Sequence, residues 1–196
     1  MKLILASSSP RRAEILREAG IAFKIRAASV EETPLPNENA ESMVIRLAEA
    51  KARAVAESLD PNISAIVIGA DTTVELDGKL FAKPRDTEHA REMLASLSGR
   101  THKVLTGICA LRLPDKMTKS AVESTAVTFA ALAPTEIESY VASGEPFDKA
   151  GGYAIQGLAG RFIPRIEGCY FNVVGLPLAR LYALLSELGW QEGDPI

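Results

Sequence analysis

Short apolar runs and longer amphipathic stretches alternate along the first part of the chain. Residues 2–6 and 65–69 are compact apolar runs, and residues 23–27 alternate between apolar and polar positions, so all three predict strands. Residues 10–20 and 40–59 carry apolar side chains at the spacing of one helix face and predict helices. This alternation of strands and helices is typical of an α/β protein.

The later part of the chain contains more strands. Residues 102–113 and 122–132 are long enough to pair with each other, and helices are expected over 87–97, over 134–143 and after Pro177. Hairpins are predicted at Asp77-Gly78, between 73–76 and 79–82, and at Glu167-Gly168, between 162–166 and 170–174. We therefore predict an α/β fold in which helices flank a mixed twisted sheet and polar motifs gather at strand ends.

Composition limits the classes of protein that the chain can belong to. With 196 residues, 47% of them hydrophobic, it can bury the core of one domain, which we place at residues 1–189, with a C-terminal tail at 190–196. A net charge of -3 and an aromatic content of 6% disfavour nucleic-acid binding. The chain shows no secretory leader and no apolar run of the roughly 20 residues that span a bilayer, so we expect a cytoplasmic protein without membrane contact. Cys109 and Cys169 are expected to be reduced thiols.

The first candidate site joins a strand to a helix. In Ser7-Ser8-Ser9-Pro10-Arg11-Arg12, Ser9 stands at the expected N-cap and Pro10 at the first helical position, so both arginines fall in the first turn. Arginines at the positive end of the helix dipole are unfavourable unless an anion lies there. Backbone N–H, hydroxyl and guanidinium groups are the donors that a phosphate chain needs. The alternative is a capped surface helix with solvated arginines.

Two acidic segments are candidates for metal or proton chemistry. Asp71, in Gly69-Ala70-Asp71-Thr72-Thr73, follows a predicted buried strand, where a carboxylate could hold a divalent cation or accept a proton from water; alternatively it forms a turn. Glu31-Glu32 opens a loop, and most carboxylates in such loops face solvent. Oxygen ligands from separate loops, together with substrate phosphates, are nevertheless the usual way in which Mg²⁺ is held.

Two lysines are candidate cations. Lys51 interrupts the apolar stripe of the helix predicted over 40–59, so its ammonium either reaches water along its stem or points into a partly buried anionic site. Lys83 precedes Pro84 just after the first hairpin, and lysines beside turns are common. The first of these two signals is therefore the more informative.

Glycines surround a tyrosine and a glutamine in residues 148–157. Glycine lets the backbone approach a ligand closely, and the amide of Gln156 can donate and accept at once, which suits the edge of a nucleobase. The alternative is a loop rich in turns. The segment matches neither a dinucleotide-binding motif nor a Walker A loop. His89 and His102 lie near no nucleophile motif and are interpreted as surface or structural residues.

Together these motifs resemble the Maf family of nucleoside triphosphate pyrophosphatases from Leu3 to about Leu188. The matching segments are Leu5-Ala6-Ser7-Ser8-Ser9-Pro10-Arg11-Arg12, Glu31-Glu32, Ala50-Lys51-Ala52, Gly69-Ala70-Asp71-Thr72, Lys83-Pro84, Leu97-Ser98-Gly99 and residues 148–157. The resemblance implies a cytoplasmic enzyme that hydrolyses a nucleoside triphosphate to the monophosphate and pyrophosphate with Mg²⁺ or Mn²⁺. It also implies an elongated, two-lobed fold with a central cleft, similar to that of inosine triphosphatases, a homodimer, and a house-cleaning role.

The resemblance also implies roles for individual residues. Ser7, Arg11, Arg12, Lys51 and Lys83 would grip the phosphates. Glu32 and Asp71 would hold the metal and water, with Asp71 accepting the proton.

Three positions are similar to the dTTP/UTP branch of that family. They are Arg11, Thr72 and Gln156, and the branch that acts on 7-methyl-GTP is expected to carry a glutamate in place of the glutamine. A glutamine can pair with the alternating acceptors and donors of uracil or thymine, whereas a carboxylate only accepts.

Two other classes of protein compete with the enzyme. One is a nucleotide-binding regulator of cell division or septum formation that acts through a partner. Carboxylates at Glu32 and Asp71 favour an enzyme, because a simple phosphate binder gains nothing from negative charge beside its ligand unless a metal intervenes. The other is a module for single-stranded nucleic acid, which the composition disfavours.

Overall fold

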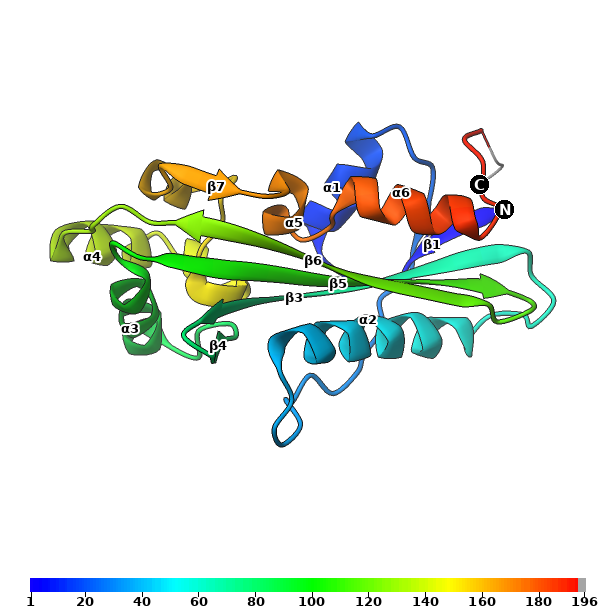
Figure 1. Cartoon of the computed structure of the whole chain (residues 1–196), viewed down its shortest axis with the longest axis horizontal. Coiled ribbons are helices and arrows are strands. Elements are labelled where there is room, and N and C mark those ends of the chain that lie inside the picture. Colours follow the sequence, from blue (N-terminus) through cyan, green and yellow to red (C-terminus); the bar gives the residue numbers. More distant parts are fainter. Residues whose placement is uncertain (194–196) are drawn as a thin grey trace. The chain divides into compact units, whose positions relative to one another are not determined.

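The computed structural model of the chain describes residues 1–193 as a sheet flanked by helices (Figure 1). The strands are β1 (Lys2–Leu5), β2 (Lys24–Ile25), β3 (Ala65–Leu76), β4 (Lys79–Phe81), β5 (Thr101–Leu113), β6 (Thr118–Thr128) and β7 (Arg165–Glu167). The α-helices are α1 (Pro10–Glu18), α2 (Ala40–Ala56), α3 (Thr87–Leu97), α4 (Pro134–Ala142), α5 (Tyr170–Val174) and α6 (Leu178–Glu187). Short 3-10 turns occupy Glu145–Asp148, Ala150–Gly152 and Leu158–Phe162.

Parallel and antiparallel pairs share one sheet. Its strand order is β2-β1-β3-β5-β6-β7, and β4 pairs with β3. Strand β1 runs parallel to both β2 and β3, whereas β4 lies antiparallel to β3 and β7 lies antiparallel to β6. The expected mixed sheet with flanking helices is therefore confirmed.

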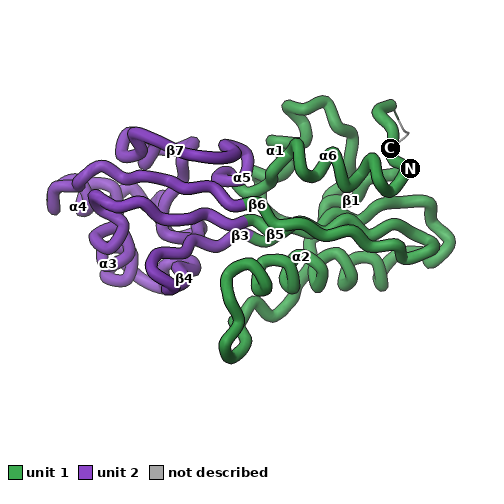
Figure 2. Tube along the Cα trace, in the orientation of Figure 1, with its two compact units in different colours: residues 1–71, 106–123, 175–196 green, residues 72–105, 124–174 purple. Residues whose placement is uncertain are grey.

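The chain divides into two compact units (Figure 2). Unit 1 contains Met1–Asp71, Thr106–Glu123 and the described residues from Gly175 onward. Unit 2 contains Thr72–Leu105 and Ser124–Val174. Strands β3, β5 and β6 each contribute residues to both units.

In unit 1, helix α2 lies on one side of the strands and α1 and α6 lie on the other (Figure 1). Glycines let α2 approach the sheet closely, because a Cβ at Gly69 on β3 would overlap the backbone of Ala48, and one at Gly107 on β5 would overlap that of Val44. Ala48 and Ala52 are fully buried in this contact. The absence of a side chain at Gly69 and at Gly107 thus sets the distance between helix and sheet.

The core of unit 2 is rich in aromatic residues. The rings of His102, Phe129 and Tyr153 meet edge to face, with centroids 4.8 to 5.4 Å apart, and Tyr140 packs on Phe162. The expected hairpin at Asp77-Gly78 is confirmed, since Leu76 pairs with Lys79 across it.

Several expectations are wrong in detail. Asp71 does not follow a strand but lies within β3, which continues to Leu76. Residues 170–174 form α5 rather than a strand, because β6 is the partner of β7 and the buried Asn172 amide donates to Val104 O and Thr125 Oγ1. Ser9 occupies the N-cap position of α1, but its side chain makes no capping hydrogen bond.

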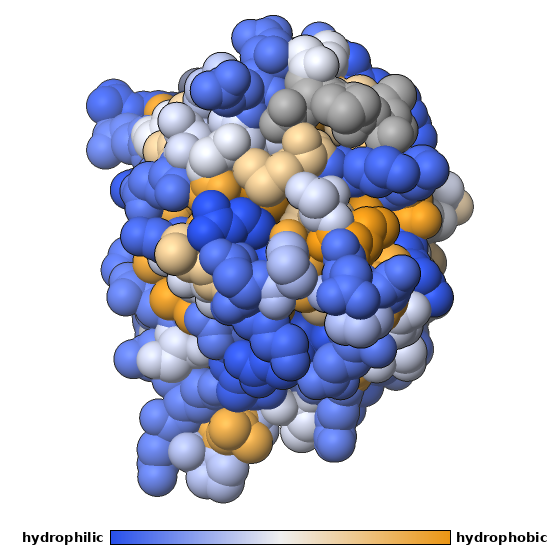
Figure 3. All heavy atoms as spheres, turned by 90° about the vertical axis from the view of Figure 1, so that its right-hand side faces the viewer, coloured by the Kyte–Doolittle hydropathy of each residue, from blue (hydrophilic) through white to orange (hydrophobic). Residues whose placement is uncertain are grey.

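The face drawn in Figure 3 is mostly hydrophilic, with small apolar areas between the polar ones. Within residues 1–193, no helix has both the length and the apolar character needed to cross a bilayer. Of the expected tail, residues 194–196 lie outside the described residues, whereas Trp190 is buried and packs edge to face against Tyr182.

Candidate active site

The close approach of α2 to β3 brings a lysine onto an aspartate. Gly69 and Asp71 are two residues apart on β3 and therefore face the same side of the sheet, the side that α2 covers. Lys51 follows the Ala48 contact by three residues on α2, and its Nζ lies 2.6 Å from Asp71 Oδ1. The lysine that interrupts the apolar stripe thus points to a buried carboxylate.

Lys51 binds a second carboxylate from the loop that precedes α2. Its Nζ lies 2.6 Å from Glu32 Oε1. The Lys51 and Asp71 side chains are 10% and 12% exposed, whereas that of Glu32 is 51% exposed. One ammonium group therefore joins a buried carboxylate to one that faces solvent.

The charge state of Asp71 reflects opposing effects. Burial is the largest and raises the pKa of this carboxyl above its usual value, while the charges of Lys51 and Arg12 lower it and that of Glu32 raises it. A carboxylate whose pKa is raised is a better proton acceptor than an ordinary surface aspartate. The arrangement suits a general base.

Arg12 ties together three segments of unit 1. Its Nε donates to Gly175 O at 2.7 Å, and its Nη1 donates to Ser7 Oγ at 3.1 Å and to Ala70 O at 3.0 Å. Burial lowers the pKa of Arg12, and the charge of Arg11 adds to this effect. Ser7 Oγ also accepts from the Ser9 N–H at 3.2 Å, so Arg12 orients the strand-to-helix loop and places a positive charge beside Asp71.

Unit 1 thus brings together five of the expected residues around one spot, and Arg11 is the neighbour of Arg12 in the first turn of α1. The five are Ser7, Arg12, Glu32, Lys51 and Asp71. The other expected residues, Thr72, Lys83 and Gln156, belong to unit 2. Thr72 follows Asp71 on β3, and strand alternation turns it to the opposite face.

Lys83 and Gln156 are exposed in unit 2. The segment that carries Gln156 is anchored on both sides. Tyr153 OH and His102 Nε2 are 2.7 Å apart in the buried core, and Glu145 Oε2 accepts from the Leu158 N–H at 3.0 Å. A Cβ at Gly157 would overlap the Glu145 carboxylate, so a larger residue there would displace this side chain. These anchors leave the Gln156 amide at the surface on a fixed backbone.

The donor set fits a hard divalent cation that is shared with a substrate. Glu32 and Asp71 present carboxylate oxygens to the same point, which Lys51 Nζ now contacts. Among residues 1–193 there is no group of three or more His, Cys, Asp and Glu side chains arranged to hold a metal by themselves. Mg²⁺ is usually bound through one or two carboxylates and substrate phosphates, which matches this pair.

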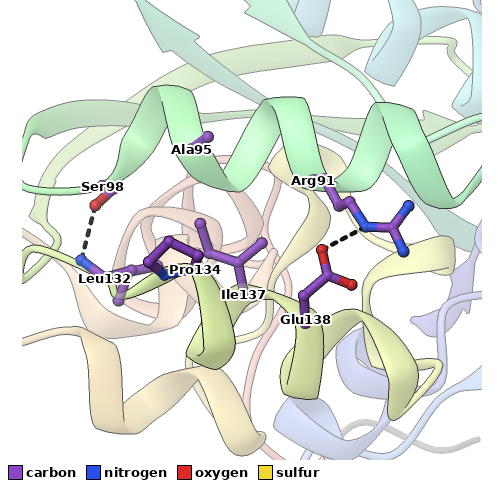
Figure 4. Close-up of a pocket in the computed structure, with 7 residues that line it drawn as sticks. All are labelled: Arg91, Ala95, Ser98, Leu132, Pro134, Ile137 and Glu138. Carbon is purple, nitrogen blue, oxygen red and sulfur yellow. Dashed lines mark hydrogen bonds and ion pairs between the residues drawn. The ribbon is translucent and has the colours of Figure 1, made fainter.

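A separate hollow of about 350 Å³ lies between α3 and α4 in unit 2 (Figure 4). In the close-up, Arg91 Nε points to Glu138 across one end and the Leu132 N–H donates to Ser98 Oγ at the other. Its remaining lining residues are Ala95, Pro134 and Ile137. It contains none of the expected site residues, and its charged pair is already satisfied.

Comparison with solved structures defines the class of fold. The chain is similar to the Ham1 protein of Staphylococcus aureus, with a TM-score of 0.54, 16% sequence identity, and coverage of 96% of this chain and 100% of that one. A likeness at this identity shows a shared fold and nothing about activity.

Comparison with protein families is more specific. The model of the Maf-like protein family matches residues 2–188, and the chain belongs to this family. A relative from Anaeromyxobacter sp. (strain Fw109-5) is 51% identical over 191 residues, covering 96% of this chain and 90% of its own length. One from Carboxydothermus hydrogenoformans is 48% identical over 190 residues, covering 97% and 100%. Both are named dTTP/UTP pyrophosphatase.

The sequence did not indicate the residues that hold the site in place. Glu145 and Tyr140, whose hydroxyl donates to Glu145 Oε1 at 2.8 Å, lie before the glycine-rich segment and carry no motif. His102 is a structural residue, as expected, but its contact with Tyr153 places it under the segment of Gln156. No local pattern distinguishes such residues, because their importance comes from what they touch.

Proposed function

We propose that this chain is a nucleoside triphosphate pyrophosphatase that hydrolyses dTTP and UTP to the monophosphate and pyrophosphate. The observation that carries the proposal is the contact of Lys51 with both Asp71 and Glu32, within the range that the Maf-like family model matches. The names of the relatives supply the substrate class. We further propose that the enzyme works in the cytoplasm as a homodimer and removes surplus or non-standard nucleotides.

Cationic groups of unit 1 would bind the triphosphate. The loop from Ser7 to Arg12 offers hydroxyl and guanidinium donors at the start of α1. Lys51 offers an ammonium group that donates to a carboxylate oxygen in the structure. Arg12 donates to Ser7 and so orders this loop before substrate arrives. From unit 2, exposed Lys83 would add a further positive charge to the phosphates.

The chemical step is an attack of water on the α-phosphorus. Asp71 takes one proton from the water, an oxygen–phosphorus bond forms, and the bond from the α-phosphorus to the bridging oxygen breaks to release pyrophosphate. Lys51 and the arginines stabilise the negative charge that develops on the phosphate oxygens. The proton later leaves Asp71 for solvent. The reaction consumes one water, because the oxygen of that water becomes part of the monophosphate.

Glu32 and Asp71 would hold a divalent cation, Mg²⁺ or Mn²⁺, together with the substrate. When bound, such an ion supplies charge neutralisation on the phosphate oxygens. Lys51 keeps the two carboxylates close to each other before the ion and substrate arrive.

Gln156 would read the base. Its exposed amide can donate to one carbonyl oxygen and accept from the ring N–H of uracil or thymine. The contacts of Tyr153 and Leu158 on either side of it hold the backbone from which this side chain extends.

A nucleotide panel tests the proposal. The purified chain is incubated with dTTP, UTP, ATP and GTP with Mg²⁺, Mn²⁺ or a chelator, and monophosphate and pyrophosphate are measured. We expect pyrophosphate release, fastest with dTTP and UTP and abolished by the chelator. In ¹⁸O-labelled water the label should enter the monophosphate. Tight nucleotide binding without pyrophosphate release would favour the nucleotide-binding regulator instead.

A further inference from the structure

The loop that carries Glu32 has little regular structure of its own. Residues 31–38, here called the Glu32 loop, lie between β2 and α2, and residues 31–37 are all exposed. Within it, one backbone hydrogen bond joins the Glu38 N–H to Leu35 O at 3.1 Å. A solvent-exposed segment of this kind would sample many conformations unless side chains held it.

An arginine of α2 supplies that restraint. Arg46 binds Glu38 through a fork, with Nε 2.6 Å from Oε1 and Nη2 2.6 Å from Oε2. Its Nη2 also donates to Thr33 O at 3.2 Å, the carbonyl of the residue directly after Glu32. The same carboxylate accepts from the Leu35 N–H at 3.0 Å. One guanidinium therefore contacts both ends of the segment 33–38.

Burial distinguishes this pair from the ordinary surface ion pairs of the chain. The Glu38 side chain is 8% exposed although its loop faces water, and that of Arg46 is 31% exposed. The bonds from Arg46 lower the pKa of Glu38 to about 2, so the carboxylate stays charged at any physiological pH. A sheltered bidentate pair of this geometry orders a backbone more effectively than an exposed single contact.

Helix α2 thus fastens the Glu32 loop at two points. Arg46 holds the backbone beside Glu32, and Lys51, five residues further along the same helix, holds the Glu32 carboxylate itself. We propose that Arg46 and Glu38 are positioning residues, which act through Glu32 by keeping its carboxylate beside Lys51 and Asp71. The inference rests on the proposed function, because it assigns these two residues to the metal-binding side of that site.

The consequence is a specific kinetic signature. Groups that orient a metal ligand typically change metal affinity or activity by about 10- to 100-fold when they are removed. Arg46→Gln should therefore raise the Mg²⁺ concentration for half-maximal activity by about tenfold, while kcat at saturating Mg²⁺ falls by less than about threefold. Glu38→Gln should act in the same direction. Arg46→Lys should not rescue the defect, because an ammonium cannot reproduce the fork.

The matched control is Arg91→Gln. Arg91 forms an ion pair of similar length with Glu138, 2.7 Å, on the surface of unit 2, and its loss should leave the Mg²⁺ dependence unchanged. Amide hydrogen exchange without nucleotide gives a readout that is independent of turnover. The Leu35 and Glu38 amides should exchange faster in Arg46→Gln than in the unmodified chain, with no change in Arg91→Gln.

A double variant separates positioning from direct contact with substrate. If Arg46 acts through Glu32, Arg46→Gln combined with Glu32→Gln should be no worse than Glu32→Gln alone. Additive losses, an unchanged Mg²⁺ dependence in an active Arg46→Gln variant, or unchanged exchange in the Glu32 loop would overturn the positioning role. Absence of pyrophosphate release by the unmodified chain would instead overturn the proposed function, so the two failures are distinguishable.

Discussion

Lys51 Nζ lies 2.6 Å from Asp71 Oδ1, and both side chains are nearly buried. Two charges removed from water in this way depend on each other, since either one alone would face a large desolvation cost. The pair therefore belongs to the stability of unit 1 as well as to the proposed chemistry.

Replacing Lys51 tests this dependence. Lys51→Gln leaves Asp71 buried without its main cationic partner, so the free energy of unfolding should fall by about 3 kcal/mol and turnover should be lost. Urea unfolding followed by circular dichroism measures the first effect, and pyrophosphate release the second. Lys119→Gln, which breaks an exposed pair with Glu187, is the control and should change stability by less than about 1 kcal/mol. Equal losses in the two variants would contradict a special role for the buried pair.

Replacing Asp71 separates chemistry from binding. Asp71→Asn keeps the size of the side chain but removes the proton acceptor, so kcat should fall by at least about 100-fold while nucleotide binding persists. Calorimetric titration with dTTP measures binding, and single-turnover assays measure chemistry. Asp77→Asn, at the exposed hairpin turn, should keep normal kinetics. Weak binding combined with normal single-turnover rates would show that Asp71 holds substrate rather than reacting.

Selectivity for the base should follow Gln156. Gln156→Glu replaces a group that donates and accepts by one that only accepts, so kcat/KM for dTTP and UTP should fall by about tenfold relative to GTP. Gln191→Glu makes the same change at an exposed position of unit 1 and should leave the ranking of nucleotides unchanged. If both variants keep the ranking, Gln156 does not read the base.

The distance between α2 and the sheet can be tested at Gly69. Gly69→Ala forces a methyl group against the Ala48 carbonyl, which should cost about 2 to 3 kcal/mol of stability and impair turnover by moving Lys51 away from Asp71. Gly78→Ala meets no neighbour within 4 Å and should cost about 1 to 2 kcal/mol, from its left-handed backbone alone. Full activity in the Gly69 variant would mean that the helix can shift without disturbing the pair.

The buried histidine of unit 2 should make stability depend on pH. Burial lowers the pKa of His102 from 6.5 to about 4, so between these values the folded chain binds fewer protons than the unfolded chain. Above pH 6.5 the neutral His102 costs the folded chain nothing. As the pH falls from 6.5 toward 4, the free energy of unfolding should decrease by up to about 1.4 kcal/mol per pH unit. His102→Phe should remove that slope.

The control for this titration is Tyr153→Phe. It removes the hydroxyl that contacts His102 Nε2 but keeps the ring that buries it, so stability should fall while the slope remains. Unfolding midpoints in urea at several pH values between 4 and 7 measure both effects. The same slope in His102→Phe as in the unmodified chain would show that groups other than His102 cause the pH dependence.

Much of the fold and part of the site could be predicted from local patterns. The strand of residues 2–6, the hairpin at Asp77-Gly78 and the helix over 40–59 follow from periodicity and turn chemistry, which neighbouring residues determine. Lys51 was recognisable because a charged residue on an apolar stripe needs a partner. The local pattern did not identify Glu32 and Asp71 as its partners, since they lie 19 and 20 residues away along the chain.

The sequence itself thus determined the order of the motifs and the alternation of strands and helices. It also determined the position of Lys51 on an apolar helix face. Tertiary structure decided that β3 continues through Asp71, because Lys51 compensates its charge inside the sheet. It also decided that residues 170–174 become α5 and that Arg46 holds the Glu32 loop. These outcomes depend on burial and on contacts between segments distant in the chain, and no local pattern of apolar and polar residues records which groups folding brings together.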